Sequence, residues 1–123
     1  MRAAKSASPE SASSDTEDIF HMTNLPPRLT GLPMSIWVRP RGNARHDVRI
    51  KVNMSHGRQM SIDNTAVAAI RPEPQVLAGR LNSEDARLVA EWIKLNAEAV
   101  VGYWNEELDT DELLERLKTP PTP

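Results

Sequence analysis

The sequence contains no cysteine, and this absence excludes several kinds of chemistry. Without thiols the chain cannot form disulfides, build a thiolate zinc site or use a cysteine nucleophile. No apolar run approaches the roughly 18 residues of a membrane helix, and the N-terminus lacks the hydrophobic stretch of a signal peptide. We therefore expect a cytoplasmic protein that neither spans a membrane nor is secreted.

Large apolar side chains are also scarce at the start of the chain, where Ile19 and Phe20 are the only ones between Met1 and Met22. A segment this polar cannot bury enough surface to fold. We expect residues 1–24 to form a disordered tail, residues 28–118 a single domain, and residues 119–123 a disordered C-terminus. Because Met22 opens the first domain-like stretch, we hypothesise that translation starts there.

The first half of the domain has the patterns of short strands. Residues 32–39 are rich in β-branched and aromatic side chains, and residues 46–54 alternate between apolar and polar side chains. Further short segments cover residues 58–62, 65–71 and 75–81. The connections are too short for crossovers, so we expect four or five mainly antiparallel strands.

The second half has the pattern of helices. Asn82 and the acids after it suit a helix start, and apolar residues then recur at spacings of three and four as far as residue 104. The core-facing residues of this stripe are expected to be Leu88, Trp92, Leu95, Ala99 and Tyr103. A shorter helix should cover residues 110–118, and the fold class is therefore α+β, a small sheet packed by one long and one short helix.

The charges are divided unevenly between these halves. Residues 28–80 contain nine Arg and Lys against three Asp and Glu, whereas residues 81–123 contain four against ten. Five of the basic residues and one tryptophan form a strip on and beside the predicted strands. The residues of this strip are Trp37, Arg39, Arg41, Arg45, Arg49 and Lys51. Such a strip suits a nucleic-acid backbone or an acidic protein, unless the acidic helices of the same domain cover it or it is simply solvated.

Recognised catalytic motifs are absent from the sequence, and we expect no metal and no cofactor. His46 lies beside Asp47 and Arg45, a combination that a metal-independent ribonuclease uses as general base and phosphate ligand. Since the strip contains one tryptophan, phosphate contact is better supported than a platform of stacked bases.

The C-terminal half resembles a family of small bacterial proteins of unknown function. The resemblance rests on residues 76–81, on residues 87–92 with Trp92, and on Tyr103, Trp104 and Asn105. The family's best-known element is a His-x-Pro-Pro-His-Phe-His stretch proposed to belong to toxin–antitoxin toxins, and of that element only His46 can be aligned here. The resemblance implies a compact sheet on a long helix and a partner protein encoded by a neighbouring gene.

Together these observations favour a non-enzymatic binding module, a toxin–antitoxin-like or regulatory component that uses the basic strand face. The alternatives are a metal-independent ribonuclease acting through His46 with Arg45 and Arg49, and a protein–protein adaptor without a nucleic-acid role.

Overall fold

The fold is a five-stranded sheet with helices on one side. A computed structural model describes residues 22–57 and 61–120. The strands follow one another in the sheet in chain order and every neighbouring pair is antiparallel. They are β1 (Thr23–Leu25), β2 (Ile36–Val38), β3 (Arg49–Asn53), β4 (Thr65–Ala69) and β5 (Gln75–Ala78). This arrangement confirms the α+β class and the antiparallel order.

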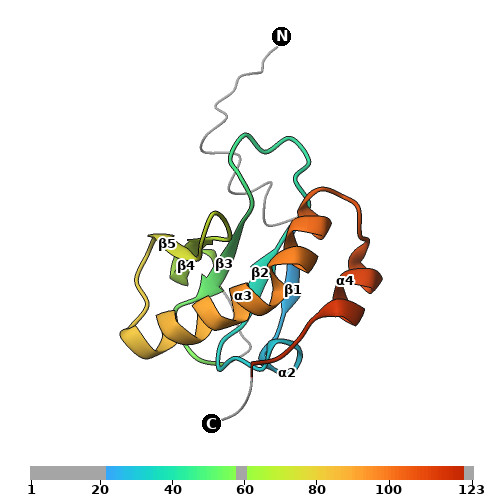
Figure 1. The fold of residues 1–123 in the computed structure, drawn as a ribbon. Coiled ribbons are helices and arrows are strands. Elements are labelled where there is room, and N and C mark those ends of the chain that lie inside the picture. Colours follow the sequence, from blue (N-terminus) through green and yellow to red (C-terminus); the bar gives the residue numbers. More distant parts are fainter. Residues whose placement is uncertain (1–21, 58–60, 121–123) are drawn as a thin grey trace.

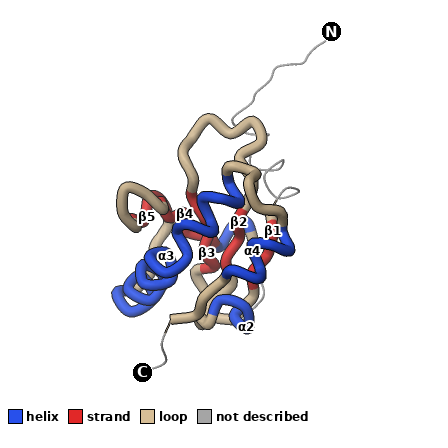
Figure 2. The backbone as a smooth tube through the Cα atoms, turned by 45° about the vertical axis from the view of Figure 1, so that its right-hand side comes forward, coloured by secondary structure: helices blue, strands red, loops and turns tan. Residues whose placement is uncertain are grey.

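The long helix α3 (Ser83–Trp104) crosses one face of the sheet, and the short helix α4 (Thr110–Arg116) lies beside it (Figures 1 and 2). The side chain of Asn82 accepts a hydrogen bond from the backbone N–H of Asp85 and begins α3, as expected from the sequence. A further single turn, α2 (Pro27–Thr30), contacts β1. No helix of the described part crosses the opposite face of the sheet (Figures 1 and 2).

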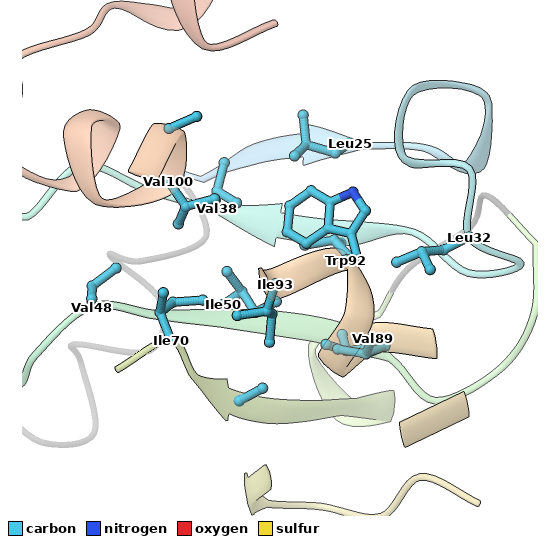
Figure 3. Packing of buried hydrophobic residues seen from close by; sticks show 14 of the residues in the cluster. Leu25, Leu32, Val38, Val48, Ile50, Ile70, Val89, Trp92, Ile93 and Val100 are labelled. Atoms are coloured by element: carbon cyan, nitrogen blue, oxygen red, sulfur yellow. The ribbon is translucent and has the colours of Figure 1, made fainter. Parts of the chain in front are cut away.

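The core lies between α3 and the sheet. In β3 and β4 buried residues alternate with half-buried ones, so each strand turns one row of apolar side chains toward the helix. Figure 3 shows Trp92 and Ile93 of α3 set among side chains of β1, β2 and β3. Trp92 is fully buried and Ile93 is 1% exposed, which identifies them as the central anchors of the domain.

The start of the domain and the segment that precedes β4 differ from the sequence-based expectation. The tail was expected to reach residue 24, but Thr23–Leu25 form β1, because their backbone pairs with β2 and Leu25 is buried. Residues 58–60 lie outside the described part, and Ile62–Asn64 form a 3₁₀ turn (η1) rather than the end of a strand, with Ser61 capping it. The expected tail over residues 1–21 lies outside the described residues.

The C-terminal segment after α4 is held to the domain further than expected. The backbone N–H of Lys118 donates to the side-chain oxygen of Asn96, and the backbone carbonyl of Lys118 accepts from the side-chain amide of Asn96. Pro120 is buried. Gly31, with a φ of 76°, packs so closely against Thr119 that a Cβ would lie 2.8 Å from its Cβ. The expected disordered terminus therefore does not begin at residue 119, and residues 121–123 lie outside the described part.

Candidate functional site

The helix-free face of the sheet carries the central residues of the predicted basic strip. Trp37 of β2 pairs with Lys51 of β3, and on the other side of β2 Trp37 pairs with Asn24 of β1. Arg49 lies two residues from Lys51 and therefore on the same face. The structure thus brings Trp37, Arg49 and Lys51 together, and we call these three residues the sheet-face cluster.

The acidic helices do not cover this cluster. α3, with Glu84, Glu91 and Glu98, lies on the opposite face of the sheet. The three side chains of the cluster are half-buried, and neither Arg49 nor Lys51 forms an ion pair with any described residue. Cations without a carboxylate partner among the described residues attract an anion more strongly than cations already matched by carboxylates, and here they lie beside an indole ring.

Arg39 and Arg41 have a different surrounding, at the end of α3. The guanidinium carbon of Arg39 lies 5.9 Å from the centroid of the Trp104 ring, a cation–π distance. The backbone N–H of Arg41 donates to the carbonyl of Trp104 at 2.8 Å. This loop therefore caps the C-terminus of α3, whose last turn contains no basic residue of its own.

An open hollow of about 820 Å³ lies between this loop and the end of α3. Arg41 and Arg45 contribute positive charge to its lining, whereas Glu106 contributes a carboxylate whose Oε2 accepts from the Gly42 N–H at 3.4 Å. The negative end of the α3 dipole also faces this region. Arg41 and Arg45 therefore meet opposing charge, unlike the sheet-face cluster.

His46 lies against the same tryptophan as Arg39. Its ring centroid is 5.4 Å from that of Trp104, and the planes are tilted by 34°. Its Nδ1–H donates to the backbone carbonyl of Asp47 at 2.8 Å, because a carbonyl can only accept. The Asp47 carboxylate, which could have oriented this ring, is instead bound by Arg71 through two nitrogen atoms, at 3.0 and 2.9 Å.

Asp47 consequently belongs to an ion pair that joins the segment before β3 to the segment after β4. The hydrogen bonds from Arg71, followed by one from the backbone N–H of Val48, hold the pKa of Asp47 below its usual value. The same pair raises the pKa of Arg71. The carboxylate of Asp47 is thus bound by Arg71, whereas the ribonuclease hypothesis had combined Asp47 with His46.

The contact of another histidine, His56, with a carboxylate was not foreseen. His56 Nε2 lies 3.0 and 3.1 Å from the two carboxylate oxygens of Asp85, whose side chain is 6% exposed, whereas that of His56 is 60% exposed. The pair joins the loop after β3 to the first turn of α3. The two residues are 29 positions apart and no local pattern links them, so only the tertiary fold reveals the contact.

The described residues lack two further kinds of feature, a cluster of metal ligands and a membrane-spanning helix. Within residues 22–57 and 61–120, no three histidine or carboxylate side chains are grouped so that they could hold a metal ion. None of the helices in this part of the chain is long and apolar enough to cross a membrane.

Comparisons with known proteins returned no match to a protein-family model, to a curated protein or to a solved structure. The resemblance to the toxin–antitoxin-associated family thus stays a prediction.

Proposed function

We propose that this protein is a non-enzymatic binding module whose sheet-face cluster contacts the phosphate backbone of a nucleic acid. The observation that supports this proposal most directly is the pairing of Trp37 with Lys51, with Arg49 on the same face. No carboxylate of the residues that the structure describes is bound to either cation. The half-exposed indole offers a surface for one sugar or base, and the cations offer contacts for two phosphates.

The distribution of charge over the two faces supports the same orientation. The acidic side chains of α3 and α4 repel a polyanion from the helical side, while the open face of the sheet attracts it. A single half-buried tryptophan gives little base discrimination, so the binding should be tolerant of sequence and sensitive to salt. In the cell this activity suits a regulatory or toxin–antitoxin-like component, in line with the resemblance of the C-terminal half.

The proposal is tested by fluorescence anisotropy with labelled single-stranded DNA and RNA of mixed sequence, across a series of salt concentrations. Reversing both charges in the Arg49→Glu/Lys51→Glu variant should raise Kd by at least about tenfold, and it should reduce the slope of log K against log salt by roughly 1.4. The matched control is Lys94→Glu, which changes the charge of an exposed lysine on α3. An equal loss in this control would refute the sheet face as the site.

The same samples separate the two alternative functions. A ribonuclease would cleave labelled RNA and lose turnover in His46→Ala, whereas a binding module retains its affinity in that variant. An adaptor without a nucleic-acid role would not bind the labelled oligonucleotides. Its protein partner would stay attached after nuclease treatment.

A further inference from the structure

The strand β5 lies at one edge of the sheet, and among the described residues it pairs with one strand only, β4. All four of its residues are exposed, including two large apolar side chains, Val76 at 38% and Leu77 at 51%. Figure 1 shows that α3 does not lie over β5. The opposite edge differs, since β1 contacts α2 and its Leu25 is fully buried.

An edge strand of this kind presents unpaired backbone N–H and C=O groups together with apolar surface, and it can therefore pair with another strand. Its ends limit the pairing to a short segment. Pro74 precedes the strand, and Gly79 follows it with a φ of 79°, so close to β4 that a Cβ would lie 2.7 Å from the Cα of Ala66. Such an edge suits one defined pairing rather than open-ended association.

The charges that flank β5 indicate which partner fits. Glu73 lies before the strand and Arg80 after it, both are exposed, and neither forms an ion pair with a described residue. When a second copy of β5 pairs in the antiparallel direction, Glu73 of each copy comes close to Arg80 of the other. A two-fold arrangement therefore creates this attraction twice.

We propose that the chain forms a homodimer in which the β5 strands of two copies pair antiparallel about a two-fold axis, giving a continuous ten-stranded sheet. The contact uses the same surface on both copies, so it closes on itself and does not propagate into a fibre. Val76 and Leu77 of each copy lose solvent exposure against the other copy. Because the axis is perpendicular to the sheet, both helix-free faces remain on the same side.

The charge requirement is tested by sedimentation equilibrium of the full chain up to about 500 µM, a range suited to a small interface. Glu73→Arg and Arg80→Glu should each raise the dimer Kd by about tenfold, since each places like charges together at both ends of the strand pair. The double variant Glu73→Arg/Arg80→Glu should recover the wild-type Kd. A wild-type chain that stays monomeric, or a dimer indifferent to these changes, overturns the proposal.

The absence of cysteine allows a second test that does not depend on affinity. Under mild oxidation Val76→Cys or Leu77→Cys should give a disulfide-linked dimer, because the axis lies near the middle of β5 and sets one of these positions opposite its own copy. The matched control is Leu114→Cys, at an exposed leucine of α4. Cross-linking that is no faster in β5 than at residue 114 rules out the strand pairing.

Discussion

At the scale of single residues, Asn96 stands out as a polar side chain inside the core. It is 1% exposed, and its amide donates to the carbonyls of Trp92 and Lys118 while its Oδ1 accepts from the Lys118 N–H at 2.7 Å. These bonds attach the segment after α4 to the middle of α3. A side chain with this many backbone partners is costly to remove, because the partners lose their hydrogen bonds as well.

We therefore predict that Asn96→Ala lowers the free energy of unfolding by about 2–3 kcal/mol, although alanine is the better helix former. Urea denaturation followed by circular dichroism measures this change. Asn105→Ala, at an exposed asparagine that ends α3, is the control and should stay within about 0.5 kcal/mol of the wild type. A similar stability for both variants would contradict the role of Asn96.

The same residue shows how far sequence patterns predict the core. The stripe of apolar residues on α3 correctly placed Trp92, Ala99 and Tyr103 in the interior. It also placed Leu95 there, yet Leu95 is 39% exposed, whereas the neighbouring Asn96 is buried. The helical period alone cannot make this distinction, because the partner that makes burial of Asn96 favourable is the backbone of Lys118, 22 positions away.

At the scale of elements, the hairpin of β3 and β4 is closed at one end by the ion pair between Asp47 and Arg71. The pKa of Asp47 in the folded state lies below the unfolded value of about 3.9. The ionised carboxylate therefore stabilises the fold above about pH 4. This contribution is lost as the pH falls through the lowered pKa. Both side chains are about half exposed, so the effect should be modest.

We predict that Asp47→Asn lowers stability at neutral pH and flattens the loss of stability on acidification, because the variant has no carboxylate to protonate at this position. Urea denaturation at a series of pH values from neutral to strongly acidic measures both effects. Glu115→Gln, on the exposed side of α4, should follow the wild-type curve. An acid limb for Asp47→Asn as steep as that of the wild type would disprove the assignment.

The elements themselves were predictable to different degrees. Strands β4 and β5 and the helices α3 and α4 begin at the expected positions, because alternation, the Asn82 cap and the helical period are local signals. Strands β2 and β3 are shorter than expected and begin at Ile36 and Arg49, inside the expected segments 32–39 and 46–54. β1 was missed, since three residues followed by Pro26 and Pro27 carry little pattern of their own. It becomes a strand only through its pairing with β2 and the burial of Leu25.

At the scale of the whole molecule, the uneven distribution of charge along the sequence becomes a difference between two faces. The sequence alone left open whether the acidic helices cover the basic strands, because which face a helix takes depends on the handedness and lengths of connections. In the structure α3 covers the apolar row of the strands and leaves Arg49 and Lys51 on the other face. The predicted strip also divides, since Arg39 and Arg41 contact Trp104 instead.

If both proposals hold, dimerisation through β5 places two sheet-face clusters on one side of one sheet. The two Lys51 residues would then be separated by five strand spacings, roughly 24 Å. A nucleic-acid strand of about 20 nucleotides reaches both clusters of the dimer, whereas a strand of about four nucleotides reaches only one. The longer strand should therefore bind roughly tenfold more tightly than a strand that contacts one cluster. We compare the affinity for the long oligonucleotide with the affinity for the short one. In Glu73→Arg, which weakens the dimer, the ratio of these two affinities should fall. The charge added by the substitution affects both affinities and largely cancels from their ratio. Anisotropy with both oligonucleotides measures it, and a ratio that stays the same in the wild type and in Glu73→Arg would show that the two copies bind independently.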